Sequence, residues 1–224
     1  MPEERLATGV RALDALLGGG IDADAVTEVY GEGGTGKSIF CLQLAARVAL
    51  AGKWVFYIDS EGVSVDKLEA IAGDDLRSVL EKLLISSPAS QAEQSRAVRN
   101  ATRLAREGGR PVGLLVVDSA TYFYRLSLGG KREERARESL AYLIAELVAA
   151  AIRTPVPVVV TNQVWRNVAE GTLEPLGGAF LNHAAKTILR FDRLPDDRRR
   201  ATLLKHRSRP EGSAEFRVTA RGLE

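Results

Sequence analysis

The chain alternates between short apolar runs and longer stretches with helical spacing of apolar side chains. Four apolar runs have the length and β-branched content of buried strands, at residues 25–31, 54–59, 112–119 and 156–163. A shorter run at 83–88 predicts another strand. Helices are predicted at residues 37–52, 64–73, 90–109 and 132–154. Strands that alternate with helices in this way predict an α/β fold, with a mostly parallel central sheet flanked by helices.

The pattern changes after about residue 184. Residues 185–194, 199–207 and 213–220 read as three strands separated by turn residues. We expect them to extend the sheet as antiparallel C-terminal strands at one edge. Because no repeat, low-complexity tract or long linker interrupts the chain, residues 1–224 are predicted to form a single domain.

Composition excludes some classes of protein and charge adds a candidate surface. No apolar run is long enough for a transmembrane helix, no secretory signal is visible, and Cys41 has no partner for an internal disulfide. We therefore expect a cytoplasmic protein without a membrane partner. The net charge is only +2, but residues 193–209 carry seven basic and two acidic side chains. This asymmetry favours an anionic partner.

The segment GEGGTGKS, residues 31–38, matches the phosphate-binding loop of P-loop NTPases. A predicted strand precedes it and a predicted helix follows it, as this motif requires. Glycine permits successive backbone N–H groups to turn toward an anion, and the helix adds its positive end. Lysine reaches the outer phosphates and the serine hydroxyl is a ligand for Mg²⁺. The predicted ATP-binding residues are Gly31, Glu32, Gly33, Gly34, Thr35, Gly36, Lys37 and Ser38.

Three further polar residues follow core strands of the predicted sheet, where the ligands of such sheets gather. Asp118 is the candidate second Mg²⁺ ligand, and the alternative is that it caps the next helix. Glu61 is the candidate catalytic base for water, and the alternative is that it is an N-cap. Gln163 is the candidate group that hydrogen-bonds the γ-phosphate and responds to its loss.

The ordered set TGVRALDALLGGGI (8–21), GEGGTGKS, YIDSEG (57–62), LLVVDS (114–119) and TNQV (161–164) resembles the RecA/RadA recombinase ATPase core over nearly the whole chain. The chain has no counterpart of RadA's extra N-terminal helical domain, and it carries KHRSRPEG at residues 205–212. In both respects it resembles the archaeal RadB recombinase paralogues. This resemblance implies an ATP- and DNA-binding accessory protein of homologous recombination and DNA repair. Its ATP hydrolysis is expected to be weak, and its partners are expected to be DNA and the main recombinase or other repair proteins.

The resemblance also places DNA-binding loops at about 121–133 and 165–179. The first combines aromatic and basic residues, which suits stacking and phosphate neutralisation on single-stranded DNA, although the aromatic residues equally suit the core. Were 200–207 a strand, Lys205 and Arg207 would share one face. They would contact DNA there, or a neighbour's nucleotide in a homo-oligomer, and the alternative is that they belong to a solvated charged strand. The candidate DNA-binding residues are Arg125, Lys131, Arg132, Arg166, Lys205, His206 and Arg207.

Two other functions fit parts of the sequence. The motif at 8–21 is equally typical of KaiC-like regulatory ATPases that act on protein partners. Such proteins tend to carry adjacent glutamates after the second core strand, whereas this chain has Asp59-Ser60-Glu61-Gly62. The other alternative is a nucleotide-dependent binding module with negligible turnover.

Overall fold

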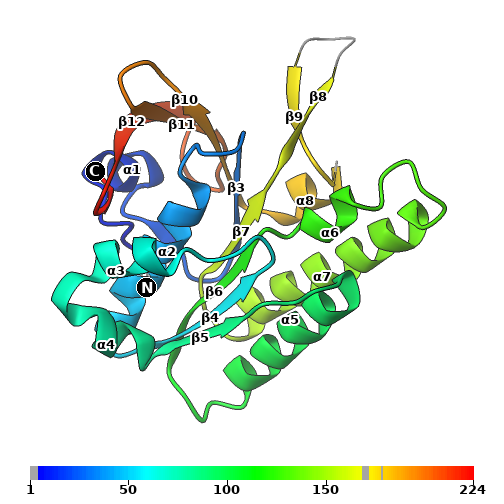
Figure 1. Ribbon diagram of the computed structural model, residues 1–224, viewed down its shortest axis with the longest axis horizontal. Coiled ribbons are helices and arrows are strands. Elements are labelled where there is room, and N and C mark those ends of the chain that lie inside the picture. Colours follow the sequence, from blue (N-terminus) through cyan, green and yellow to red (C-terminus); the bar gives the residue numbers. More distant parts are fainter. Residues whose placement is uncertain (1–4, 168–171, 178) are drawn as a thin grey trace.

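The computed structural model describes residues 5–167, 172–177 and 179–224. Its centre is a sheet of nine described strands with helices on both faces (Figure 1). In spatial order the strands are β13 (Gly222–Leu223), β12 (Gly212–Thr219), β11 (Arg198–Lys205), β10 (Thr187–Arg193), β3 (Val26–Tyr30), β7 (Val158–Asn162), β6 (Val112–Asp118), β4 (Trp54–Asp59) and β5 (Leu83–Ser86).

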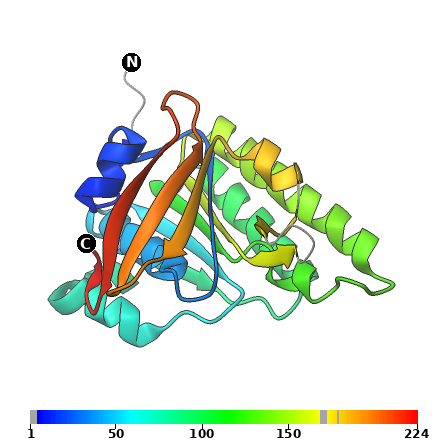
Figure 2. The ribbon, with the colours of Figure 1, turned by 90° about the horizontal axis from the view of Figure 1, so that it is seen from above.

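The six strands from β10 to β5 are mutually parallel, and β11, β12 and β13 continue the sheet antiparallel. The predicted mostly parallel sheet with antiparallel C-terminal strands is therefore confirmed. Of the three C-terminal runs, the first differs in direction from the prediction, because β10 pairs parallel with β3. Figure 2 shows β10, β11 and β12, in orange and red, side by side at one side of the sheet.

Each face of the sheet packs on its own helical layer. The main helices are α1 (Arg11–Leu17), α2 (Lys37–Leu50), α3 (Val65–Ala72), α4 (Leu76–Leu80), α5 (Gln91–Arg106), α7 (Glu133–Arg153) and α8 (Ala179–Ala184), with a 3-10 turn at Gly73–Asp75. Buried side chains of α1, α2, α3 and α4 form one core cluster with the sheet. Side chains of α5, α7 and α8 form the other. The sheet thus lies between two helical layers, which leaves its strand ends open to ligands.

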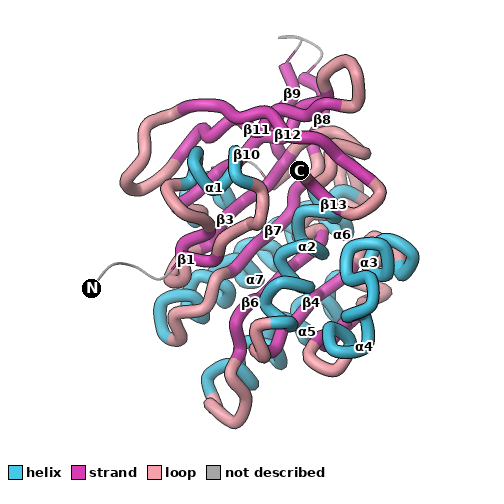
Figure 3. The backbone as a smooth tube through the Cα atoms, turned by 90° about the vertical axis from the view of Figure 1, so that its left-hand side faces the viewer, coloured by secondary structure: helices cyan, strands magenta, loops and turns pink. Residues whose placement is uncertain are grey.

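Several short elements were not predicted. They include β1 (Arg5–Leu6) paired with β2 (Ile21–Asp22), the one-turn helix α6 (Tyr122–Arg125), and the hairpin of β8 (Val164–Asn167) and β9 (Thr172–Pro175). Helices α1, α4 and α8 and strand β13 were not predicted either. Helix α1 packs against β11 and β12, below the C-terminal strands in Figure 3. None of the helices in the described part of the chain is long and apolar enough to cross a membrane.

Candidate functional site

The phosphate-loop sequence forms the connection between β3 and α2, at the carboxyl end of a central strand. Gly31 requires glycine, because a Cβ at this position would lie 2.2 Å from the carbonyl oxygen of Phe191 on β10. Thr35 is buried and its hydroxyl donates a hydrogen bond to the Glu32 carbonyl oxygen at 2.9 Å. Glu32, Gly33 and Ser38 are exposed. The loop is therefore anchored at its base and open at its tip.

Lys37, the first residue of α2, turns back over this loop. Its Nζ donates hydrogen bonds of 2.8 Å to the carbonyl oxygens of Gly31 and Glu32. Burial lowers the pKa of Lys37, while the negative charges of Glu61 and Asp118 act in the opposite direction. The lysine and both carboxylates therefore lie within electrostatic reach of one another.

Asp118 ends β6 and is 4% exposed. The Tyr57 hydroxyl donates to its Oδ2 at 2.8 Å, and the Thr161 hydroxyl donates to its Oδ1 at 2.5 Å. These donors come from β4 and β7, the strands on either side of β6. The helix-cap alternative is excluded, because the next helix, α6, has Thr121 as its N-cap. The carboxylate is instead held at the strand tip, where a hard cation would need it.

The neighbouring Asp59 organises the turn that carries Glu61. Its carboxylate accepts backbone N–H bonds from Glu61 at 3.1 Å, Gly62 at 2.8 Å and Val63 at 2.6 Å. The N-cap of α3 is Ser64, so the N-cap alternative for Glu61 is excluded. The Glu61 side chain is exposed, and its Oε1 accepts a hydrogen bond of 2.6 Å from Gln163 Nε2. The structure thus brings the two candidate catalytic residues into direct contact.

A buried polar network beneath Gln163 escaped the sequence analysis. Asn162, the last residue of β7, accepts a hydrogen bond from the Thr121 hydroxyl at 2.6 Å. Its Nδ2 donates to Glu28 Oε1 and to the Leu176 carbonyl oxygen, each at 2.7 Å. Burial raises the pKa of Glu28 to about 7, against opposing effects of Asn162 and Lys205. A single Glu or Asn inside an apolar run gives no sign of such a partner, which explains the omission.

The predicted first DNA-binding loop contains α6 and a turn. Tyr124 is 8% exposed and belongs to the hydrophobic core. For this aromatic residue, the alternative of packing in the core is therefore the correct one. Tyr122 and Phe123 are half-buried and pack edge to face. Arg125, Lys131 and Arg132 are exposed.

The predicted second loop contains the β8–β9 hairpin and the start of α8. Trp165 on β8 is 47% exposed. Arg166 lies on β8, but its side chain is outside the described part of the chain, as are residues 168–171 and 178.

The prediction that Lys205 and Arg207 share a strand face is wrong, because β11 ends at Lys205. Lys205 Nζ donates to the Asn182 carbonyl oxygen at 2.7 Å. Arg207 instead forms ion pairs with Asp22 at 3.2 Å and with Asp24 at 2.5 Å.

His206, also a candidate for DNA contact, is not available for one. Its side chain is 1% exposed, with Nε2 3.8 Å from Asp22 Oδ2. Burial lowers the pKa of His206, against the attraction of Asp22. The buried carboxylate of Asp22 therefore lies beside both side chains, of which that of His206 is buried and that of Arg207 stays partly in contact with solvent.

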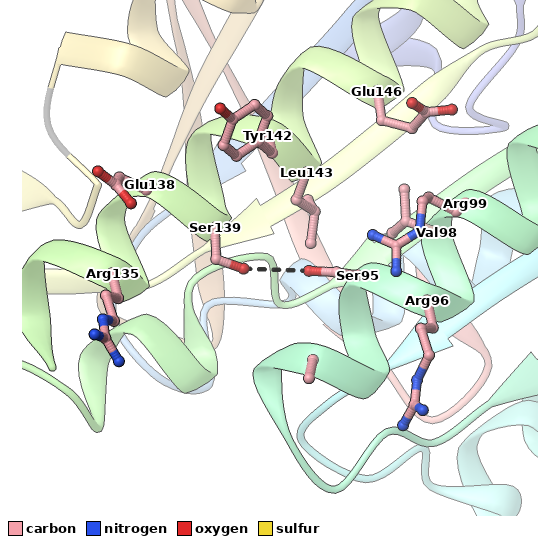
Figure 4. A pocket seen from close by; sticks show the side chains of 11 residues that line it. Ser95, Arg96, Val98, Arg99, Arg135, Glu138, Ser139, Tyr142, Leu143 and Glu146 are labelled. Carbon is pink, nitrogen blue, oxygen red and sulfur yellow. Dashed lines mark hydrogen bonds between the residues drawn. The ribbon is translucent and has the colours of Figure 1, made fainter.

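A groove of about 640 Å³ between α5 and α7 lies apart from all these motifs (Figure 4). Ser95 and Ser139 meet across it at 3.3 Å, and Arg96, Arg99, Arg135 and Tyr142 stand along its walls. None of the predicted nucleotide-site residues lines it. The described residues also contain no group of three or more His, Cys, Asp or Glu side chains that could hold a metal ion by themselves.

Comparison with known proteins identifies relatives over the whole length of the chain. Residues 4–224 match the Rad51 family. The chain is 41% identical over 224 residues to the DNA repair and recombination protein RadB of Methanoculleus marisnigri, covering 100% of this chain and 99% of the relative. It is 40% identical over 223 residues to the protein of the same name from Methanococcoides burtonii, covering 99% and 98%. For the one from Archaeoglobus fulgidus the identity is 37% over 221 residues, covering 98% and 97%.

These matches span the phosphate loop, the Asp118 strand and the C-terminal strands together, as the resemblance predicts. The chain therefore belongs to the Rad51 family and, within it, to the RadB group.

Proposed function

We propose that this chain is an ATP-binding and DNA-binding accessory protein of homologous recombination and DNA repair. It assists the main recombinase or other repair proteins, and it hydrolyses ATP weakly in a DNA-dependent manner. The observation that carries the proposal is the meeting of Lys37, Asp118, Glu61 and Gln163 at the carboxyl edge of one sheet, beside the phosphate loop. We further propose that residues 1–224 act as one domain, in the cytoplasm, with self-association as a further option.

The residues present fit ATP with Mg²⁺. The loop amides and the start of α2 offer positive ends of backbone dipoles to the phosphates. Mg²⁺ usually takes one or two protein oxygens and completes its shell with phosphates and water. Ser38 and Asp118 are the two oxygen donors that this chain would contribute. Lys37, now satisfied by loop carbonyls, would exchange those partners for phosphate oxygens.

The bound nucleotide supplies an anhydride bond whose γ-phosphate can be transferred to water. Glu61 is exposed and close to Lys37, so it is placed to orient a water and accept its proton. Gln163 holds Glu61 by a hydrogen bond of 2.6 Å and would exchange it for the γ-phosphate. Because Gln163 directly follows Asn162, this exchange would also reach Leu176 at the base of the β8–β9 hairpin.

For DNA we propose a contact through Arg125, Lys131 and Arg132, which are exposed on the loop that follows the Asp118 strand. None of the three forms an ion pair with another described residue. They are therefore available for phosphates, whereas Lys205, His206 and Arg207 are engaged within the chain.

The test is the affinity for single-stranded DNA, measured by fluorescence anisotropy across a salt series with and without Mg·ATP. We expect binding that weakens steeply with salt and changes when ATP is added. Reversing Lys131 and Arg132 to Glu should weaken binding and flatten the salt dependence. Arg106→Glu, at an exposed arginine at the end of α5, is a control for charge reversal elsewhere on the surface and should bind DNA as the wild type does.

Absence of DNA binding at low salt in both nucleotide states would contradict the proposal and favour a regulatory ATPase that acts on proteins. If the chain binds DNA but calorimetry detects no ATP binding, the proposed ATP-binding function is contradicted. In that measurement Lys37→Ala serves as the negative reference, since it removes the lysine that meets the outer phosphates.

A further inference from the structure

Two arginines of the C-terminal hairpin contact the phosphate loop from outside the motif. Arg193, at the end of β10, donates through Nη2 to the Gly33 carbonyl oxygen at 2.6 Å. Arg199, on β11, donates through Nη2 to the Gly34 carbonyl oxygen at 3.4 Å. Consecutive peptide units at the tip of the loop are thus held by side chains that follow them by about 160 residues in sequence.

The two guanidinium groups form a like-charge pair, which needs an explanation. Arg193 and Arg199 are directly opposite each other in the β10–β11 ladder, an arrangement that destabilises a sheet. Neither forms an ion pair with a described carboxylate. By contrast, their neighbours Arg198 and Arg200 both pair with Glu215, at 2.9 and 3.2 Å.

The surroundings of the pair are adapted to it. Arg199 Nε is buried without a hydrogen-bond partner among the described residues. Gly34 has φ of +72°, and a Cβ there would come within 2.1 Å of Arg193 Nη2. Glycine at this point of the loop therefore serves both the left-handed turn and the close approach of the arginine. Lys37 adds a third cation close by, since Arg193 contributes to lowering the pKa of Lys37, after burial.

The geometry of the peptide bond shows what the contacts achieve. The carbonyl of one residue and the N–H of the next belong to one planar trans unit and point in opposite directions. An arginine that holds the Gly33 carbonyl therefore turns the Gly34 N–H away from itself. In the same way, Arg199 on the Gly34 carbonyl directs the Thr35 N–H away from the hairpin. These N–H groups are the ones with which a phosphate loop surrounds its anion.

We propose that Arg193 and Arg199 are positioning residues of the phosphate loop, which fix two of its peptide units so that their amides face the nucleotide. The proposal rests on ATP binding at this loop, as inferred above. It also accounts for the like-charge pair, because the bound phosphates supply the negative charge that the protein itself does not place there.

The test compares Mg·ATP and Mg·ADP affinities of Arg193→Gln, Arg199→Gln and Arg193→Lys by calorimetry. We expect Arg193→Gln to weaken binding of both nucleotides about tenfold, the size expected for a lost hydrogen bond from a charged donor. Arg199→Gln should weaken binding less, since its contact is longer. Arg193→Lys, which keeps a cationic donor, should restore most of the affinity. The control Arg200→Gln, on β11 next to Arg199, should bind both nucleotides as the wild type does.

Thermal unfolding without nucleotide separates positioning from simple structural support. In Arg193→Gln the relief of like-charge repulsion should offset the lost hydrogen bond to Gly33, so the melting temperature should change little although the ATP affinity falls. Wild-type affinity in Arg193→Gln would overturn the proposal, as would a loss that Lys does not rescue and that accompanies a lower melting temperature. If the wild type itself failed to bind ATP, the proposed function would fall first, and this inference with it.

Discussion

Gln163 donates a hydrogen bond of 2.6 Å from Nε2 to Oε1 of Glu61, although the two residues lie 102 positions apart in the chain. The contact joins the ends of two strands, β4 and β7, across the site. A phosphate near Gln163 or a water near Glu61 would bind at or directly beside this hydrogen bond. Under the proposed function, we expect this contact to link the response to the γ-phosphate with the placement of the attacking water.

The first prediction concerns this pair. Glu61→Gln keeps the size of the side chain but removes the proton acceptor. We expect ATP turnover to fall about 100-fold or more, with ATP affinity retained within about threefold. Single-turnover hydrolysis with labelled ATP measures the first quantity, and calorimetry measures the second. Glu69→Gln, at an exposed glutamate of α3, is the matched control. Wild-type turnover in Glu61→Gln would rule out Glu61 as the base.

A second prediction concerns the donors that hold Asp118. Burial raises the pKa of Tyr57 well above its usual range, and the charge of Asp118 adds to the effect, so the hydroxyl stays protonated as a donor. Tyr57→Phe should lower the free energy of unfolding by about 2 kcal/mol, because the hydrogen bond is to a charged group. The stabilisation by Mg·ATP should then be larger than in the wild type, since the cation replaces the lost donor. Urea unfolding with and without Mg·ATP measures both effects.

Tyr142→Phe is the control for this experiment, because the Tyr142 side chain is 78% exposed. It should leave both free energies unchanged. An equal loss of stability in Tyr57→Phe with and without Mg·ATP would show that Asp118 does not meet the metal.

The third prediction is a pH dependence from Glu28. Its pKa is about 7 in the folded chain, against 4.5 for the ordinary side chain. The folded state therefore binds a proton more tightly than the unfolded state. The resulting stability is fully present below about pH 4.5 and is lost as the pH rises through about 7.

Glu28→Gln should remove this dependence, because the amide oxygen still accepts from Asn162 and no charge forms. Between pH 5 and pH 8 we expect the variant to gain about 2 kcal/mol on the wild type in free energy of unfolding. Denaturant titrations at several pH values provide the measurement. Parallel stability curves for the two proteins would show that Glu28 titrates normally.

A fourth prediction concerns the contacts that tie the chain's first strands to residues 206–209. Asp22 has a fully buried side chain that pairs with Arg5 at 2.9 Å and Arg207 at 3.2 Å. Asp22→Asn removes the negative charge that pairs with these two arginines and should lower the free energy of unfolding by about 3 kcal/mol. Asp24→Asn, whose side chain is 45% exposed, should cost about 1 kcal/mol or less. Similar losses in both variants would contradict the assigned burial.

The sequence predicted the fold well where the apolar pattern decides it. The runs of β3, β4, β6 and β7 are buried on both faces, so their patterns are long and unambiguous. The sequence did not predict the direction of β10, because an apolar run looks the same in a parallel and in an antiparallel strand. A parallel strand needs a crossover, and here the β8–β9 hairpin and α8 provide it.

The predictions for the site divide in a similar way. The loop motif and the strand-end residues Asp118, Glu61 and Gln163 follow from local sequence and from the rule that ligands gather at strand ends. Asn162, Arg193 and Arg199 act through partners that are distant in sequence, so local reading had no means of finding them. The expected role of His206 failed for a related reason, because a buried Asp22 draws it inward.

The pairing of β3 affects how the protein folds during its synthesis. This strand ends at the phosphate loop, yet its two neighbours lie much later in the chain, β7 at Val158–Asn162 and β10 at Thr187–Arg193. Both are therefore synthesised long after β3. Such non-local pairing closes late, because the entropy of a long loop must be overcome first. A nascent chain released from the ribosome before β10 would hold the complete GEGGTGKS segment but lack the neighbour that supports it. We therefore expect nucleotide binding to arise only after β10 has been synthesised and has paired with β3.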